Sequence, residues 1–221
     1  MIHVFCTRKS DGARALAKLL GGKKVKQIDN TASLVVNWGS LYPAHAFAKA
    51  LNGAVFHNKF KELQQLSSAG IPVPKHSKGL PGQAGWMARK NKHQEANDLL
   101  AALPFGDYYV KLEPIEEEYR VHSFRNKTLR LGKKVPRVVS PHPVFRSWKA
   151  GWKLSYAQWN PPDGLRSLAH KAVKALGLDF GAVDIGVKPN GDLVVFEVNT
   201  APGLEGNTIN KYADAIKALD S

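Results

Sequence analysis

The hydrophobic positions follow two different periods along the chain, and their succession predicts a mixed α/β protein. Short apolar runs at residues 2–6 and 33–37 are typical of buried strands. Between them, residues 11–20 show the apolar spacing of a helix, which ends at Gly21 and Gly22. A strand, a helix and a strand in succession predict a small α/β unit at the N-terminus.

The rest of the chain predicts antiparallel strand pairs separated by helices. Asn58 is placed to cap a helix that runs to residue 69 and stops at Gly70. A polar turn at residues 125–127 predicts a hairpin between two alternating segments. The other expected elements are strands at 86–90, 108–112, 118–124, 128–132, 182–187 and 193–198, and helices at 94–103, 165–176 and 209–219.

Glycine, proline and small polar residues predict a loop at residues 77–85, and we place the domain boundary within residues 57–80. We predict a short N-terminal α/β domain over residues 1–56 and a larger domain over residues 57–221. The larger domain is expected to have a central lobe at 57–112 and a C-terminal lobe at 113–221.

The amino-acid composition indicates the compartment in which the protein works and the class of partner that it binds. The 32 Lys and Arg residues exceed the 18 Asp and Glu residues, and the resulting formal charge of +14 favours an acidic partner or a polyanion. Cys6 is the single cysteine, which excludes an intramolecular disulfide and a cysteine-rich zinc site. No apolar run approaches the roughly 18 residues that a membrane span needs. We therefore expect a soluble cytoplasmic protein without membrane association.

Three oxygen-bearing side chains fall on the last two expected strands. Glu197 and Asn199 are two positions apart, so they point to one face of their strand, and Asp184 can lie opposite them in a tight hairpin. Two carboxylates and an amide oxygen suit Mg²⁺ that also binds water and substrate phosphates. Spacing alone leaves a second interpretation open, in which these are solvent-facing strand residues.

A turn and several cations accompany these residues. Pro202 and Gly203 turn the chain after the last strand, so that the following backbone amides can approach an anion closely. Basic residues on separate rigid elements are what a nucleotide triphosphate requires. Those considered for this role are Lys59, Lys90, Lys111 and Arg120.

Four segments of the chain together resemble a known family. They read HNKFKELQQLSSAGIPVP, EEEYRVHSF, LGLDFGAVDIGV and VVFEVNTAPGLEG, in the order seen in ATP-grasp carboxylate–amine ligases. The last segment is most similar to the ribosomal-protein glutamate ligase (RimK-like) branch. The resemblance covers roughly residues 57–215.

The resemblance implies an ATP-grasp fold of class α/β (α+β). Two lobes of antiparallel sheet with helices would hold ATP between them, after a short Rossmann-like α/β unit. It implies ATP and Mg²⁺ as cofactors, with Mn²⁺ as an alternative metal. In the implied reaction a carboxylate attacks the γ-phosphate to give an acylphosphate, an amine captures this species, and ADP and phosphate are released.

The same resemblance assigns roles to single residues. Lys59 and Lys90 match lysines that contact phosphates, and Glu118 matches the acid that binds the ribose hydroxyls. Arg120 and Arg146 match arginines that face the phosphates and the acylphosphate. The hinge that presents backbone groups to adenine matches Tyr109, Val110, Lys111 and Leu112, and the magnesium ligands match Asp184, Glu197 and Asn199.

Two departures from the family pattern concern the substrates. The N-terminal unit is shorter than the usual domain, which contributes to the acceptor site, so the resemblance leaves the substrate open. The glycine-rich phosphate loop expected after Lys90 is replaced by NKHQEANDLL. We expect weaker coverage of the phosphates by backbone amides unless His93 and Gln94 take over this role.

A basic aromatic segment, FRSWKAGWKLSYAQW at residues 145–159, has three interpretations. It can stack on the bases of a single-stranded nucleic acid and neutralise its phosphates. It can instead pack over the core of its lobe, or close as a lid over the acceptor. With the +14 charge, an acidic protein tail or a nucleic acid is compatible as the acceptor.

The sequence therefore predicts an ATP-dependent ligase that joins a carboxylate, of an amino acid or a peptide, to an amine. The alternatives are a phosphotransferase of the same fold and a basic nucleic-acid-binding protein with a nucleotide-sensing site. The residues identify neither substrate, and a homo-oligomer is compatible with them.

Overall fold

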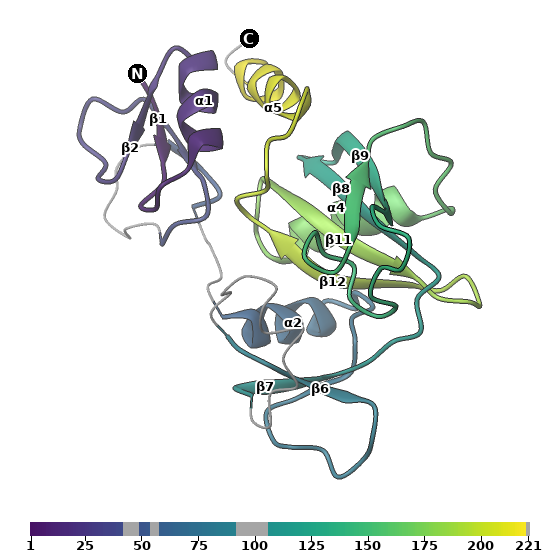
Figure 1. The fold of residues 1–221 in the computed structure, drawn as a ribbon. Helices are drawn as coiled ribbons and strands as arrows, with labels where there is room; N and C mark the ends of the chain where they lie inside the picture. Colours follow the sequence, from purple (N-terminus) through teal and green to yellow (C-terminus); the bar gives the residue numbers. More distant parts are fainter. Residues whose placement is uncertain (42–48, 54–57, 92–105, 220–221) are drawn as a thin grey trace.

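The computed structural model describes residues 1–41, 49–53, 58–91 and 106–219, and within them the chain forms three β-sheets and four α-helices (Figure 1). We call these the N-terminal sheet (β1 to β4), the small sheet (β5 to β7) and the large sheet (β8 to β12). None of the described helices is long and apolar enough to cross a bilayer.

Part of the sequence prediction falls outside the described residues. The expected helix at 94–103, His93 and Gln94 as phosphate contacts, and the domain boundary between residues 56 and 57 all lie there. The two domains and two lobes therefore stay a prediction. Each of the three sheets is nevertheless built from residues of one predicted unit.

The N-terminal sheet is parallel, with the strand order β2-β1-β3-β4. The predicted apolar runs form β1 and β3, whereas β2 and β4 are three-residue strands without a strong apolar pattern and were not predicted. The hydroxyl of Ser10 caps the helix by accepting a hydrogen bond from the amide of Ala13. The elements are β1 (Ile2–Phe5), α1 (Asp11–Leu19), β2 (Lys23–Val25), β3 (Leu34–Asn37) and β4 (Lys49–Leu51).

The last helix, α5 (Thr208–Lys217), packs against α1 and so returns the end of the chain to the N-terminal sheet (Figure 1). Tyr212 of α5 lies in one buried core with Leu16 of α1 and Phe180 of the large sheet. The ring of Trp38 stacks on Phe180 with centroids 5.3 Å apart. The N-terminal sheet and the large sheet thus share one hydrophobic core.

The large sheet is antiparallel, with the order β10-β9-β8-β11-β12. Helix α4 covers one face, where Tyr119 and Val121 of β8 share a core with Leu165 and Ala169 of α4. The alternate residues of β8 therefore point to the opposite face. The elements are β8 (Glu117–Phe124), β9 (Lys127–Pro136), β10 (Trp152–Ser155), α4 (Leu165–Ala175), β11 (Phe180–Val187) and β12 (Leu193–Asn199).

The small sheet has the order β5-β7-β6, and α2 lies between it and the large sheet (Figure 1). As predicted, Asn58 caps α2, with its side-chain oxygen accepting from the amide of Lys61 at 3.0 Å. Leu63 of α2 packs on the small sheet, and Leu66 packs into the core of the large sheet. The elements are α2 (Lys59–Ser68), β5 (His76–Ser77), β6 (Trp86–Arg89) and β7 (Tyr108–Lys111).

One buried asparagine ties the N-terminal sheet to the large sheet. Asn52, just after β4, has a φ of 55°, which asparagine tolerates better than most residues. Its side-chain oxygen accepts from the amides of Asp179 at 2.8 Å and Phe180 at 3.1 Å, and its side-chain nitrogen donates to the Phe180 carbonyl at 2.9 Å. The amide of Asn52 donates to the Asp179 carboxylate at 2.8 Å.

Asn52→Ala is expected to lower the free energy of unfolding by about 2–4 kcal/mol, because buried backbone groups at the start of β11 lose their partners. Urea denaturation of both proteins measures the change. Asn190→Ala, in the exposed turn between β11 and β12, is the control and should stay within about 0.5 kcal/mol of wild type. Equal stabilities of the two variants would contradict this account.

Candidate functional site

A cavity of about 540 Å³ lies between the small sheet and the large sheet. The small sheet and the link that follows it supply mainly apolar lining, such as Met87, Val110 and Leu112. The large sheet supplies the charged lining residues Glu118, Arg120, Lys134, Lys153, Asp184 and Glu197. Such a cavity suits a ligand with a flat apolar part and a highly charged part.

A β-bulge in the last hairpin decides which of its side chains face the cavity. Asp184 pairs directly with Glu197, but the next pair is Ile185 with Val195, so Phe196 is an extra residue in β12. As a result Phe196 and Glu197 both line the cavity. The predicted approach of Asp184 to Glu197 is therefore present, and it is a direct cross-strand pair.

A second bulge sets the register between β8 and β9. The pairing shifts by one position between His122 and Ser123, which puts Gly132 opposite Arg120. The absence of a side chain at Gly132 leaves room for the ring of Tyr156, since a Cβ there would lie 2.8 Å from that ring. The same register brings Lys134 beside Glu118.

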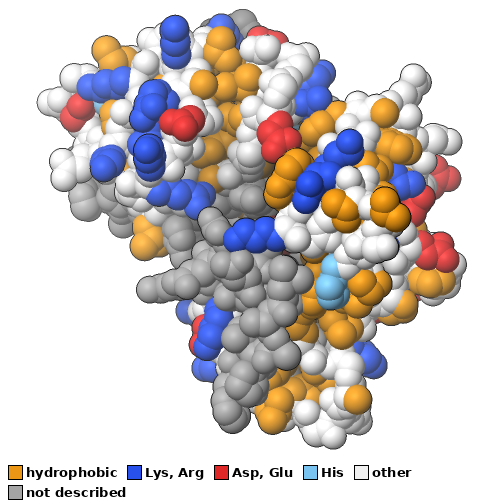
Figure 2. Space-filling view, viewed as in Figure 1, with side chains coloured by type: hydrophobic (Ala, Val, Ile, Leu, Met, Phe, Trp, Pro, Cys, Tyr) orange, Lys and Arg blue, Asp and Glu red, His pale blue; other side chains and the backbone are white. Residues whose placement is uncertain are grey.

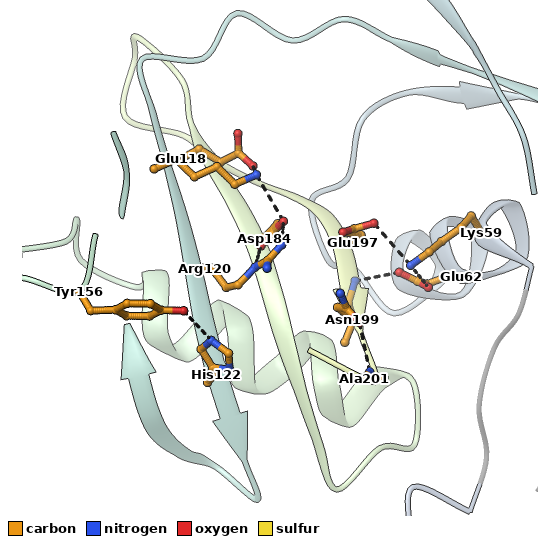
Figure 3. Close-up of polar contacts among 12 residues, drawn as sticks. Lys59, Glu62, Glu118, Arg120, His122, Tyr156, Asp184, Glu197, Asn199 and Ala201 are labelled. Carbon is orange, nitrogen blue, oxygen red and sulfur yellow. Dashed lines mark hydrogen bonds and ion pairs between the residues drawn. The ribbon is translucent and has the colours of Figure 1, made fainter. Parts of the chain in front are cut away.

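Asp184 is held by two cations on neighbouring strands (Figure 3). The guanidinium of Arg120 donates to Asp184 through Nε at 2.6 Å and through Nη2 at 2.7 Å. The ammonium of Lys134 bonds Glu118 and lies 3.5 Å from Asp184 Oδ2. These contacts run across β11, β8 and β9 on the cavity face.

The pKa shifts of these acids differ in direction. Burial would raise the pKa of Asp184, but Arg120 and Lys134 hold it below its ordinary value. Burial raises the pKa of Glu118 above its ordinary value, against the opposing effect of Lys134. Of these two carboxyl groups, Asp184 therefore loses its proton more readily than Glu118.

Lys59 approaches the network from α2. Its ammonium lies 3.0 Å from Glu62 and 3.6 Å from Glu197 (Figure 3). Burial would lower the pKa of Lys59, but Glu62 and Glu197 raise it above its ordinary value. Cations from α2, β8 and β9 thus converge on the carboxylates of β11 and β12.

The predicted ligand Asn199 lies opposite Ala182, at the end of β12. Its side-chain oxygen accepts a hydrogen bond from the amide of Ala201 at 3.1 Å (Figure 3). This bond starts the turn that leads into Pro202 and Gly203. An amide oxygen has a second lone pair, so the bond is compatible with a metal ligand.

The side-chain oxygens of Asp184, Glu197 and Asn199 suit a hard divalent cation, but they are too few to fill its coordination shell. Asp184 and Glu197 supply two facing carboxylates, and Asn199 supplies a neutral oxygen. Within the part of the chain that the structure describes, no group of three or more acidic, histidine or cysteine side chains is placed to hold a metal. Mg²⁺ here would need oxygens from a bound phosphate and from water, as is usual in nucleotide sites.

Lys90 and its neighbour Arg89 point to different surroundings. Lys90 is exposed, and its ammonium lies 3.8 Å from Asp107. Arg89, one position earlier, lines the cavity. Because successive strand residues face opposite sides, Arg89 is on the cavity side of β6. The assignment of Lys90 to a phosphate stays a prediction.

The predicted hinge lies along β7. Val110, Lys111 and Leu112 line the cavity, whereas the hydroxyl of Tyr109 accepts from the amide of Gly106 at 3.5 Å. The amides of Lys111 and Leu112 donate to backbone carbonyls at 2.8 Å each, on both sides of the strand. These two N–H groups are therefore already engaged.

Arg146 lines the cavity beside the link between the two sheets. Its guanidinium donates to the carbonyls of Ile115 at 2.7 Å and Glu116 at 3.0 Å. It also lies over the ring of Trp152, 4.7 Å from the centroid. In this structure Arg146 fastens the segment that contains it to that link.

The basic aromatic segment has several surroundings. Trp148 and Trp152 line the cavity, and Trp148 is 65% exposed. Trp159 packs against the core of the large sheet and donates to the carbonyl of Ser155. The segment is therefore partly a cavity wall and partly a packing arm.

Sequence reasoning missed Lys134, Glu62 and Arg89. Lys134 lies past the predicted end of its strand, and only the bulge in the hairpin puts it, rather than Lys133, beside Glu118. Glu62 looks like an ordinary surface residue of an amphipathic helix, but it is buried. For Arg89 a signal existed, because strand alternation excludes that it and Lys90 share a face.

Comparison with known sequences supports the resemblance. No family model matches the chain. It is 27% identical over 203 residues to the D-alanine–D-alanine ligase of Pseudomonas entomophila (strain L48), covering 77% of this chain and 62% of that protein. It is also 27% identical over 176 residues to a probable alpha-L-glutamate ligase of Legionella pneumophila (strain Corby), covering 67% and 57%. The chain thus spans about three fifths of the length of the curated relatives it matches.

Solved structures establish the fold. The ATP-grasp ligase PsnB, complexed with a minimal precursor, matches with a TM-score of 0.68 at 16% identity over 98% of each chain. A RimK domain protein ATP-grasp from Sphaerobacter thermophilus DSM 20745 matches with a TM-score of 0.64 at 14% identity, covering 98% of this chain and 99% of that one. The predicted ATP-grasp fold is confirmed.

His122 continues the cavity face of β8 beyond Arg120 and is fully buried. Its ring nitrogens lie 3.3 Å from the Tyr212 hydroxyl and 3.2 Å from the Tyr156 hydroxyl. Burial, with the nearby charge of Arg120, lowers the pKa of His122 to about 3. The folded protein therefore keeps this ring neutral.

We expect His122 to make stability depend on pH. The unfolded chain binds the proton of His122 more tightly than the folded protein does. The neutral ring therefore makes its full contribution to the free energy of unfolding above about pH 6.5, and this contribution is lost as the pH falls towards 3. Between pH 6 and pH 4 the free energy of unfolding of His122→Gln should fall less steeply than that of wild type, by up to about 1.4 kcal/mol per pH unit. Parallel curves from urea unfolding at stepped pH would contradict the assignment.

Proposed function

We propose that the chain is an ATP-dependent ligase that joins a carboxylate to an amine through an acylphosphate and releases ADP and phosphate. The observation that carries the proposal is the network of Asp184 and Glu197 with the cations Lys59, Arg120 and Lys134 beside the cavity. The relatives found by sequence are named as ligases, which supports the same reaction class.

The apolar part of the cavity would take the adenine. Because the amides of Lys111 and Leu112 are engaged in the small sheet, the base would use carbonyls of this stretch or backbone groups of residues 113–115. Glu118, at the other side of this link, would accept hydrogen bonds from the ribose hydroxyls. Its contact with Lys134 would then be exchanged for one with the nucleotide.

The cations of the network would take the phosphates. Lys59, Arg120 and Lys134 now balance carboxylates, and a triphosphate offers them a larger anionic partner. Arg89, which lines the cavity, is an additional candidate for this role beside Lys90. Three cations on separate elements can follow a triphosphate along its length.

Asp184, Glu197 and Asn199 would hold Mg²⁺ together with phosphate oxygens. The bound cation would neutralise phosphate charge, and Mn²⁺, which prefers the same oxygen ligands, would substitute. The proposed metal and nucleotide agree with two structures of PsnB, one solved with Mg and ADP and the other with AMPPNP.

The chain's own residues would make the attack of a carboxylate possible. A carboxylate and a triphosphate repel each other, and fixed cations in a cavity reduce that repulsion as charge moves to the leaving oxygen. Arg120, which now makes two hydrogen bonds to Asp184, would turn to the phosphates when the nucleotide and the metal bind. The amine then attacks the acylphosphate, so no nucleophile from the protein is needed.

A peptide is the substrate class that we propose for the carboxylate. PsnB and the macrocyclase MdnC from Microcystis aeruginosa MRC have both been solved with precursor peptides. On the face shown in Figure 2, Lys and Arg side chains gather over the N-terminal unit, which favours an acidic peptide tail over a neutral one. Nucleic acid, as the other polyanion, is an outcome that the test must separate.

Product analysis tests the reaction class. The protein is incubated with Mg²⁺-ATP and pools of amino acids, peptides with acidic tails, polyamines or oligonucleotides; ADP is measured and every reacting tube is examined by mass spectrometry. We expect a product whose mass is the sum of two substrates minus water. A phosphorylated product would show a phosphotransferase instead. Salt-dependent oligonucleotide binding without ATP turnover would favour the nucleic-acid-binding alternative.

Glu197→Gln should lower ATP turnover by about 100-fold or more and leave the melting temperature near that of wild type. It removes one charge from the carboxylate pair at a partly exposed position. Glu205→Gln is the matched control, because Glu205 also lines the cavity but lies on the exposed loop after β12. Turnover of Glu197→Gln near that of the control would show that the metal ligands are misassigned.

A further inference from the structure

Glu62 is a buried carboxylate that the proposed reaction does not use. It is 3% exposed, and its two oxygens serve two different elements. Oε1 accepts from the amide of Val198 in β12 at 2.8 Å, and Oε2 accepts from the ammonium of Lys59 at 3.0 Å (Figure 3). Glu62 therefore joins α2 to the strand that carries Glu197.

Lys59 is shared unequally between two carboxylates. Its contact with Glu62 is a hydrogen bond at 3.0 Å, whereas Glu197 lies 3.6 Å away, beyond a good hydrogen bond. A lysine ammonium is a compact charge on a flexible stem, so it moves readily to the stronger of two nearby anions. Among the described residues, Glu197 would be the nearest carboxylate partner of Lys59 if Glu62 lost its charge.

The edge of β12 does not itself require a carboxylate. A little earlier on the same strand, the amide of Val195 donates to the backbone carbonyl of Pro72 at 2.8 Å. A neutral oxygen is thus sufficient to satisfy this edge. What distinguishes the position of Glu62 is its second oxygen, which holds Lys59.

We infer that Glu62 is a positioning residue that takes the closer contact of Lys59 and so limits how strongly this lysine competes with the divalent cation for Glu197. The inference rests on the proposed function, in which Glu197 binds Mg²⁺ and Lys59 binds phosphate. Glu62 itself touches neither ligand. Its role is to keep the ion pair between Lys59 and Glu197 at 3.6 Å, so that it does not close to a hydrogen bond.

Glu62→Gln tests this inference, because glutamine keeps an acceptor for the Val198 amide and nearly the same volume but has no charge. Calorimetry measures the binding of AMPPNP, at one fixed nucleotide concentration, over a series of Mg²⁺ concentrations. The value compared between proteins is the Mg²⁺ concentration that gives half-maximal binding. We expect this concentration to rise about tenfold, because Lys59 then competes with Mg²⁺ for Glu197. A value equal to that of wild type would overturn the inference.

The double variant Lys59→Met with Glu62→Gln removes both charges of the ion pair between these residues, and with Lys59 it removes the group that competes with Mg²⁺ for Glu197. It is charge-balanced, which keeps the test usable if the single variant unfolds. We expect its half-maximal Mg²⁺ concentration to return to that of wild type, although AMPPNP binds more weakly. A value still raised tenfold would show that Glu62 acts through the backbone of β12 and not through Lys59.

Asp179→Asn is the matched control, since Asp179 makes the same pair of contacts outside the cavity. It accepts from the amide of Asn52 at 2.8 Å and from Arg125 at 3.0 Å. Its variant should leave the Mg²⁺ requirement unchanged, and an equal rise would overturn the inference by showing a general loss of stability. Wild-type protein that binds no AMPPNP at any Mg²⁺ concentration would overturn the proposed function as well.

Discussion

Two carboxylates, Asp184 and Glu197, stand directly opposite each other across β11 and β12, and much of the surrounding structure compensates for their repulsion. Like charges at facing positions of a sheet are destabilising. Arg120 bonds Asp184 with two hydrogen bonds, Lys134 lies beside it, and Lys59 approaches Glu197 from another element. A chain that needed only a stable sheet would not place two acids there, so the arrangement points to a cationic ligand.

The layers around this pair explain how it is held. Helix α4 fills the opposite face of the large sheet with apolar side chains, which fixes the strands that carry the charges. The small sheet closes the other side of the cavity, and α2 lies between the two sheets with apolar residues packed into both cores. In the proposed function, the exchange of internal ion pairs for a metal and a triphosphate would need side-chain movements, while the strands could stay in place.

The sequence was sufficient for the elements with strong patterns and for the fold. Strands β8, β11 and β12 and the Asn58-capped α2 were predicted within a few residues, whereas the short strands β2, β4, β5 and β10 were not. The register was harder to predict, because two bulges, at Phe196 and beside His122, move facing pairs by one position. These bulges bring Glu197 opposite Asp184 and Lys134 beside Glu118. The local sequence pattern does not predict where either bulge lies. Burial of Glu62 likewise depends on the packing of α2 against a strand more than 130 positions later.

A crystal structure with Mg²⁺ and AMPPNP tests the central claim most directly. The account predicts the metal between Asp184 and Glu197, the phosphates at Lys59, Arg120 and Lys134, and the base against Val110 and Leu112. It also predicts that the two hydrogen bonds from Arg120 to Asp184 are loosened or lost as the phosphates take their place. Nucleotide bound elsewhere, or a metal that contacts neither carboxylate, would contradict it.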